Sequence, residues 1–340
     1  FESSIMSSYK RLVAFTTVLT FLLIMLGAFV RLTDAGLGCP DWPGCYGKLT
    51  PTHAAEEIAA AVEAQGGTHG PVSIPKAWKE MVHRYVATFL GFLIIGIMAM
   101  AWIKRRELKQ SPALPTILFF AVCLQGAFGA WTVTMLLKPA IVTGHLIGGM
   151  TILGLLTWLW LRQTSNARTV APPRDAAGLR LLARIGFVAV AAQIILGGWV
   201  STNYAAVVCT DFPTCQGSMW PHMEFDHAFH IVRELGETPD GEILNVASLT
   251  AIHFIHRIGA LIVTAVLGVL AFALWRNPGT KLLAIKVVAV LTLQIAMGIG
   301  NVVFQLPLWL AVAHNGGAAL LLVTLILVNY RVAGNRHRIS

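Results

Sequence analysis

The chain is a succession of apolar stretches of about 20 residues separated by short charged segments. Few charges interrupt these stretches, and we expect one helix over each of the eight: about 12–31, 82–103, 113–133, 140–161, 180–201, 250–274, 282–303 and 308–329. Each is long enough to cross the hydrocarbon core of a bilayer. Buried helices of a large soluble protein are the alternative, which eight such stretches with charged ends disfavour. The pattern therefore predicts an all-α polytopic membrane protein with eight transmembrane helices.

A cysteine motif divides this pattern into two equivalent halves. Cys39-Pro-Asp-Trp-Pro-Gly-Cys45-Tyr-Gly47 returns 170 residues later as Cys209-Thr-Asp-Phe-Pro-Thr-Cys215-Gln-Gly217. Each half also repeats two histidines and a Gln-x-x-x-Gly pair: His83, His145 and Gln125–Gly129, then His256, His314 and Gln294–Gly298. Because four spans return the chain to its starting side, we expect two tandem four-helix bundles related by a pseudo-two-fold axis along the membrane normal. The halves are residues 11–162 and 179–332, and a basic linker over 163–178 joins them.

The charge distribution predicts the orientation in the membrane. Hydrophobic residues make up 56% of the chain and charged residues 12%, which excludes an ordinary soluble domain. Most of the 25 Lys and Arg residues fall on one side of the predicted spans, at both chain ends and in the linker. By the positive-inside rule both termini are cytoplasmic and the cysteine loops lie on the outer face. The net charge of +9 reflects this bias and gives no support for nucleic-acid binding.

The segments outside the spans give two further expectations, one for the start of the chain and one for the long loops. We expect residues 1–5, ahead of Met6, to be foreign to the native chain, and the first apolar stretch to be a span and no cleavable signal. Each long outer loop is expected to contain one short surface helix, over 54–65 in the first loop and 227–235 in the second.

The two cysteine pairs are candidates for disulfide bonds. Both lie in loops expected outside the cytoplasm, where disulfides form, and a pair within one short loop closes without much rearrangement. Zinc sites are the rival, but they usually space their cysteines more closely. The spacing favours one disulfide in each loop, Cys39–Cys45 and Cys209–Cys215, and leaves open whether they are structural or redox-active. Cys123, inside the third span, is expected to be a small apolar core residue.

The four repeated histidines are the candidate ligands. Each lies near the outer end of an even-numbered span, where a polar residue is costly and usually faces the bundle interior. A satisfied interfacial histidine is the alternative for any single one, and four at matched depth disfavour it. Two imidazoles from neighbouring helices fit bis-axial ligation of a haem iron. A bare metal ion is less well supported, because no carboxylates or thiolates inside the membrane complete its coordination.

The two candidate sites differ by one acid. Glu80 lies three residues before His83 and shares its helix face, whereas His253 stands three residues before His256. A carboxylate beside a haem can take protons or orient water, so the asymmetry predicts one catalytic and one electron-transfer haem. A solvated surface charge is the alternative for Glu80. Arg84 and Arg257 follow the two histidines, and each either pairs with haem propionates or snorkels to the lipid headgroups.

These features together resemble haem A synthases of the cysteine-containing bacterial type. Gly27-Ala-Phe-Val-Arg-Leu-Thr-Asp-Ala-Gly-Leu-Gly-Cys39-Pro-Asp-Trp-Pro-x-Cys45-x-Gly47 is similar to the first-loop signature of that family. Four further segments are similar to its haem positions: Glu80-x-x-His83-Arg84, Gly144-His145, His256-Arg257 and His314-Asn-Gly316. The resemblance covers nearly the whole chain from about residue 11.

The resemblance implies oxidation of a ring methyl of haem O to a formyl group, giving haem A for terminal oxidases. It implies that His83, His145 and Arg84 bind substrate haem O, that His256, His314 and Arg257 bind a permanent haem b, and that Glu80 is catalytic. Cys39–Cys45 would be the functionally sensitive pair and Cys209–Cys215 the more structural one.

The resemblance also implies a location and partners. The location is the bacterial inner membrane. A haem O synthase would supply the substrate within the lipid bilayer, an unidentified electron donor or acceptor would complete the reaction, and the glycine-rich spans allow a homo-oligomer.

One chemical difficulty leaves two routes open. A haem iron held by two histidines has no free position at which to activate oxygen. Either one ligand leaves during turnover, or oxidation occurs at the ring edge, with water as the oxygen donor and Glu80 as the proton acceptor.

Three other functions are compatible with parts of the pattern. A dihaem b-type membrane electron carrier explains the histidines but not the single acid. A thiol–disulfide relay explains the cysteines but not the histidines. A transporter fits the duplication, but the polar residues cluster at the outer face and leave the midplane without charges.

Overall fold

The computed structural model describes residues 2–164 and 176–333. Within them, eight helices are long and apolar enough to cross a membrane. Their bounds are α1 (Glu2–Leu32), α3 (Ile74–Ile103), α5 (Ala113–Thr134), α6 (Pro139–Thr164), α7 (Ala176–Thr202), α8 (Val246–Trp275), α9 (Lys281–Val303) and α10 (Leu308–Ala333). The shortest, α5, has 22 residues and spans about 33 Å, slightly more than the hydrocarbon core.

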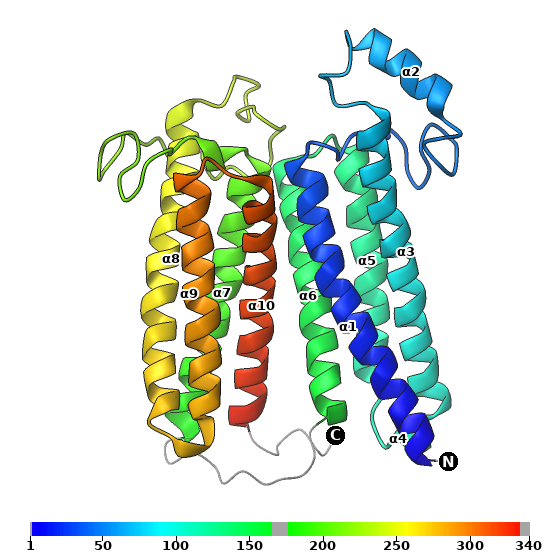
Figure 1. The fold of residues 1–340 in the computed structure, drawn as a ribbon, viewed down its shortest axis with the longest axis vertical. Helices are drawn as coiled ribbons and strands as arrows, with labels where there is room; N and C mark the ends of the chain where they lie inside the picture. The colour runs from blue at the N-terminus through cyan, green and yellow to red at the C-terminus, as the bar shows by residue number, and fades with distance from the viewer. Residues whose placement is uncertain (1, 165–175, 334–340) are drawn as a thin grey trace.

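The eight long helices form two bundles that stand side by side (Figure 1). In the first, α1 and α5 each contact both α3 and α6; in the second, α7 and α9 each contact both α8 and α10. Each bundle is therefore a ring of four helices, in which α3 lies diagonally opposite α6 and α8 lies diagonally opposite α10. The halves meet where α1 and α6 contact α10 and α6 contacts α7.

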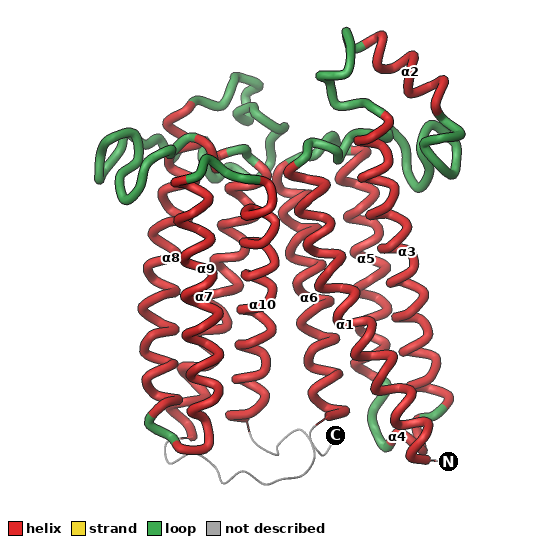
Figure 2. Tube along the Cα trace, viewed as in Figure 1, coloured by secondary structure: helices red, strands yellow, loops and turns green. Residues whose placement is uncertain are grey.

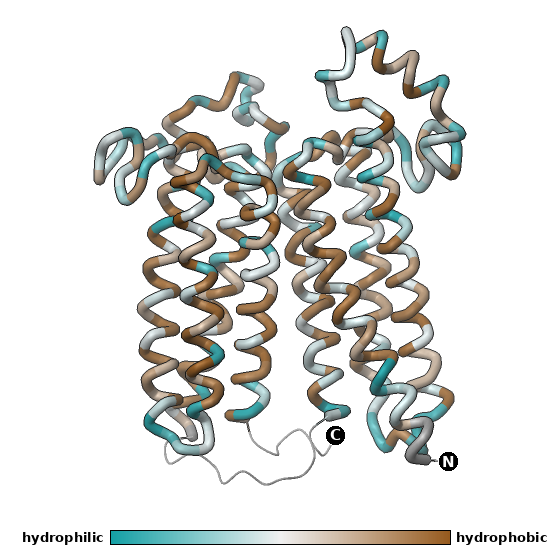
Figure 3. Tube along the Cα trace, in the orientation of Figure 1, coloured by the Kyte–Doolittle hydropathy of each residue, from teal (hydrophilic) through white to brown (hydrophobic). Residues whose placement is uncertain are grey.

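The described helices form two apolar cores, one within the first bundle and one in the second bundle that extends to Met150 and Leu153 of α6. Tyr9, Ile94 and Leu156 belong to the first core, and Leu267, Val287 and Leu325 to the second. Hydrophobic residues occur along the whole length of the helices, and hydrophilic residues are concentrated toward the helix ends (Figure 3). A bilayer requires this distribution, because apolar side chains are stable against the hydrocarbon core. The helices also satisfy their own backbone hydrogen bonds there.

The long loops gather at one end of both bundles (Figure 2). Four short helices complete the described elements: α2 (Ala55–Ala64), α4 (Arg105–Leu108), η1 (Ala205–Val207) and η2 (Pro278–Thr280). The repeat extends to backbone conformation, since the α5–α6 turn places Leu136 and Leu137 at positive φ and the α9–α10 turn does the same with Gln305 and Leu306. Two consecutive left-handed residues without glycine are uncommon, so the turn is a shared feature of both halves.

Residues that correspond in the repeat meet at the junction of the two halves. Arg31 donates to the carbonyl of Ser201 at 2.7 Å, and the hydroxyl of Tyr204 donates to Asp34 at 2.7 Å; both pairs are 170 residues apart. This is the displacement of the cysteine motif. Such contacts support the pseudo-two-fold relation, which stays a prediction.

The predicted spans are confirmed, although two helices begin markedly earlier than predicted, and the first is α1, which begins at Glu2 and not at residue 12. The second span was predicted from residue 82, whereas α3 begins at Ile74, because apolar content does not register helical turns that rise above the bilayer. The predicted surface helix over 54–65 is confirmed as α2. Residues 165–175 of the predicted linker lie outside the described residues.

Two smaller predictions were wrong. Residues 227–235 form turns and bends without a helix. The buried Arg233 bonds there to Asn203 and stacks against Trp199, which ties the segment to the bundle. Cys123 is exposed, because a small apolar residue is as stable against lipid as in a core.

Candidate functional site

The four repeated histidines lie on the diagonal helices of the two bundles. His83 is on α3 and His145 on α6; His256 is on α8 and His314 on α10. The prediction that each pair comes from neighbouring helices was therefore wrong in detail. Side chains from diagonal helices project toward the bundle axis from opposite sides. This arrangement leaves the two remaining helices of each ring to form the walls of the site.

Capping residues ahead of the spans define where α3 and α8, the helices of His83 and His256, begin. The side chain of Ser73 accepts from the Lys76 amide at the start of α3, and that of Asn245 accepts from the Ser248 amide at 2.8 Å at the start of α8. Capping satisfies backbone N–H groups that would otherwise have no helical partner. Both helices therefore begin about two and a half to three turns before their histidines, near the loops.

The histidines of the first half face each other. The ring centroids of His83 and His145 are 6.4 Å apart, with an interplanar angle of 70°. The Nδ1 atoms of both rings are buried and have no hydrogen-bond partner. Two metal–imidazole bonds of about 2 Å, plus the two ring radii, give a centroid separation of about 6 Å. The spacing thus fits two axial ligands on one iron.

A glycine on a wall helix lies against each histidine ring. A Cβ atom added at Gly27 on α1 would lie 3.1 Å from Cε1 of His83, and one at Gly129 on α5 would lie 3.3 Å from Cε1 of His145. The second half repeats this arrangement at 3.1 Å with Gly197 beside His256 and Gly298 beside His314. The absence of a side chain at these positions lets each ring seat edge-on against the wall.

The donor set fits a haem better than a bare ion. Among the described residues, no three His, Cys, Asp or Glu side chains converge on one point. An iron whose four other ligands come from a porphyrin needs only two imidazoles from the protein. The unpartnered ring nitrogens and the facing pair in the first half agree with that requirement.

Glu80 is the one acidic residue in the described membrane spans, the first of which begins at Met6 within α1. It is 4% exposed, so the alternative of a solvated surface charge was wrong. Its Oε2 accepts from the amide of Cys39 at 2.9 Å, and its Oε1 forms an ion pair with Arg84. His253, at the equivalent position, instead places Nδ1 at 3.0 Å from the carbonyl of Ala205. A buried carboxylate therefore stands beside the first histidine pair alone.

The two cysteine loops are closed in the same way. Disulfides Cys39–Cys45 and Cys209–Cys215 are both formed, as predicted. In the first loop the carboxylate of Asp41 accepts from the amides of Tyr46 and Gly47; in the second, Asp211 accepts from Gln216 and Gly217. Gly47 and Gly217 have positive φ, which the tight turn requires.

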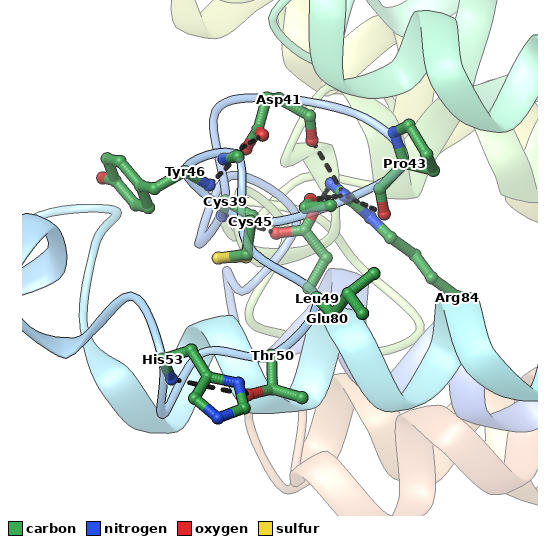
Figure 4. The surroundings of a disulfide bond; sticks show 12 residues. Cys39, Asp41, Pro43, Cys45, Tyr46, Leu49, Thr50, His53, Glu80 and Arg84 are labelled. Atoms are coloured by element: carbon green, nitrogen blue, oxygen red, sulfur yellow. Dashed lines mark hydrogen bonds and ion pairs between the residues drawn. A yellow bond between two sulfur atoms is a disulfide. The ribbon is translucent and has the colours of Figure 1, made fainter.

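Arginines attach these loops to the histidine helices. Figure 4 shows the side chain of Arg84 reaching into the first loop beside Glu80. It donates to the carbonyls of Asp41, Pro43 and Gly44. Arg257 donates likewise to the carbonyls of Thr214, Asp211 and Cys209. The guanidinium groups thus bind loop carbonyls, and their predicted contact with haem propionates stays a prediction.

Several residues of the site were not predicted from sequence. Gly27 and Gly197 lie in the repeat but carry no chemistry of their own, and their role depends on which ring packs against them. Gln193 was missed as well: its amide lies 2.8 Å from the carbonyl and 3.0 Å from Nδ1 of His256. The spacing Gln193–Gly197 matches the repeated Gln-x-x-x-Gly pairs and is the signal that points to it.

This geometry agrees with the relatives of the chain. Residues 10–326 match the model of the COX15-CtaA family, described as cytochrome oxidase assembly protein. The chain belongs to this family. It is 42% identical to a protein named heme A synthase from Shewanella oneidensis, over 94% of this chain and 95% of the relative. A heme A synthase from Mesorhizobium japonicum is 29% identical over 89% of this chain and 84% of the relative.

Proposed function

We propose that the protein is a haem A synthase, an oxidoreductase that converts a ring methyl of haem O into the formyl group of haem A. The observation that supports this most directly is that His83 and His145 face each other and that one buried carboxylate, Glu80, lies on α3 with His83. The relatives named heme A synthase support the same reaction.

The two bundles take different roles in this proposal. His83 and His145 hold the iron of substrate haem O in the first half, and His256 and His314 hold haem b in the second. When bound, haem b supplies single-electron transfer. The glycines beside the four rings leave room for the rings to seat, and the apolar helix walls exclude water from the substrate.

Glu80 handles protons at the first site. With water as the oxygen source, conversion of a methyl to a formyl group releases four protons and four electrons, and the electrons pass to the acceptor. Glu80 has two oxygen atoms held by the Cys39 amide and by Arg84, which keep the carboxylate in place close to His83. A buried carboxylate in a fixed position can accept the protons that the methyl carbon loses.

The proposal includes a location and partners. The protein is a multi-pass protein of the bacterial inner membrane, with both termini in the cytoplasm and the disulfide loops on the outer face. A haem O synthase delivers the substrate through the lipid bilayer, and an unidentified electron donor or acceptor exchanges electrons with the second half.

Replacing the carboxylate tests the proposal. Glu80→Gln should retain both haems but form no haem A when the protein is co-expressed with a haem O synthase, because the amide cannot accept a proton. Acid extraction and mass identification of the haems measure this. Glu56→Gln, on the exposed face of α2, is the control and should give normal haem A. Normal haem A in Glu80→Gln would refute the catalytic role.

A further inference from the structure

Three of the four candidate ligands are held by a glutamine from the preceding span. The amide Nε2 of Gln125 donates to the carbonyl of His145 at 2.8 Å, and that of Gln193 donates to the carbonyl of His256 at 2.8 Å. On α9, Nε2 of Gln294 lies 3.4 Å from Nε2 of His314 on α10. Each glutamine lies four residues before the glycine that contacts the same ring.

A second glycine makes room for each glutamine. A Cβ atom added at Gly148 would lie 2.0 Å from Oε1 of Gln125. The same construction gives 2.1 Å for Gly259 against Gln193 and 2.2 Å for Gly317 against Gln294. These glycines each follow their histidine by three residues, so any larger residue there would displace the glutamine. Glutamine and glycine therefore form one unit, which we call the glutamine clamp.

His83 has no glutamine clamp. The position four residues before Gly27 is Leu23, and the position three residues after His83 is Val86. Both belong to the apolar core of the first bundle. Both parts of the clamp are thus replaced together, which is consistent with a clamp that works only as a pair.

These contacts hold the backbone of His145 and His256 and lie against the ring of His314, and outer contacts to a ligand residue fix its orientation. We propose, on the basis of the proposed function, that Gln125, Gln193 and Gln294 are positioning residues for fixed ligands, and that His83 is the exchangeable ligand of the substrate haem. The second half then keeps two fixed ligands, which suits electron transfer. The first half has one fixed and one exchangeable ligand, so an iron position becomes free at the site that contains Glu80.

Carbon monoxide is the probe for this difference. The full-length protein, purified with both haems and reduced with dithionite, should bind carbon monoxide at the substrate haem and leave haem b six-coordinate. The preparation is one in which the first half holds the product haem A, because haem b and a formyl-bearing haem absorb at different wavelengths and can then be followed separately. Equal reaction of the two haems, or reaction of haem b alone, would overturn the proposal.

Exchanging the clamp between halves is the sharper test. Leu23→Gln with Val86→Gly should lower carbon monoxide binding at the substrate haem about 10-fold, in line with the usual effect of such outer contacts. The matched reverse exchange, Gln193→Leu with Gly259→Val, should make haem b reactive or selectively remove it. Wild-type behaviour of both double variants would overturn the proposal. Gln193→Leu alone serves as a second variant with the smaller change.

The failure of this inference is distinguishable from that of the proposed function. Absence of haem from both halves, or haem b with no haem A formed, contradicts the proposed function. Two haems and normal haem A formation, without selective carbon monoxide binding, contradict the exchangeable ligand alone.

Discussion

At the scale of single residues, the site depends on positions that have no side chain. A Cβ atom added at any of the four glycines beside the histidine rings would lie 3.1 to 3.3 Å from Cε1 of the ring. At this separation even a methyl group needs the ring to shift by a few tenths of an ångström. Ligand geometry is therefore set jointly by the histidine and by the glycine opposite, and the glycine is as important as the ligand.

Gly129→Leu should lower haem occupancy of the first half about 10-fold, because the new side chain overlaps the ring of His145 and moves it off the iron. Haem b in the second half should remain. Extracted haem per protein measures both.

Gly126→Leu is the matched control, since Gly126 lies one turn away on α5 with open space around it. It should retain both haems. Equal haem loss in the two variants would show that the effect is a general one on α5.

At the scale of elements, the disulfide loops are self-contained units that the arginines fasten to α3 and α8. The second loop shows how its closure depends on charge. Hydrogen bonds from Thr214 and from the amides of Gly217 and Gln216 lower the pKa of Asp211 below its usual value. The folded loop therefore binds the charged carboxylate in preference to the neutral one.

This shift has a definite sign. A pKa that folding lowers stabilises the folded loop. This stabilisation is present above the unfolded pKa of about 4 and is lost as the pH falls through the folded pKa. Hydrogen exchange of residues 209–217, corrected for intrinsic rates, should speed up below about pH 4. Asp211→Asn should abolish this pH dependence. An unchanged pH profile in Asp211→Asn would contradict the assignment.

At the scale of the whole molecule, the two bundles are joined by a polar cluster at the end of their junction where the long loops lie. Arg31 on α1 lies 3.9 Å over the ring of Tyr204, forms an ion pair with Asp34 and donates to Ser201. Tyr204 in turn donates to Asp34. The cluster contains residues of both halves and joins them at the loop end of the bundles, where apolar packing ends.

Arg31→Ala should lower the stability of the protein by about 2 kcal/mol, because it removes a charged hydrogen bond and a cation–π contact at once. Tyr204→Phe removes only the hydroxyl and should cost about 1 kcal/mol. Thermal unfolding in detergent measures both, and retention of wild-type stability in Arg31→Ala would show that apolar helix packing alone holds the halves together.

The sequence was sufficient for the spans and the disulfides, because hydrophobic length and repeated spacing report on them directly, and the ligand roles of the four histidines stay predictions. It could not show that the histidines come from diagonal helices, since that depends on the order of helices around each ring. The role of Gly27 or Gln193 was also out of reach, because neither residue has a function until its partner ring is known. The contacts of Arg84 with loop carbonyls were not predicted either, because they depend on how the disulfide loop folds over α3.

The most direct test is selective loss of haem from each half. Protein co-expressed with a haem O synthase should contain haem b and a haem O-derived haem. His145→Ala should lose the haem O-derived haem and keep haem b, whereas His314→Ala should lose haem b and keep the other. Loss of both haems from either variant, or of neither, would contradict two separate haem sites in the two halves.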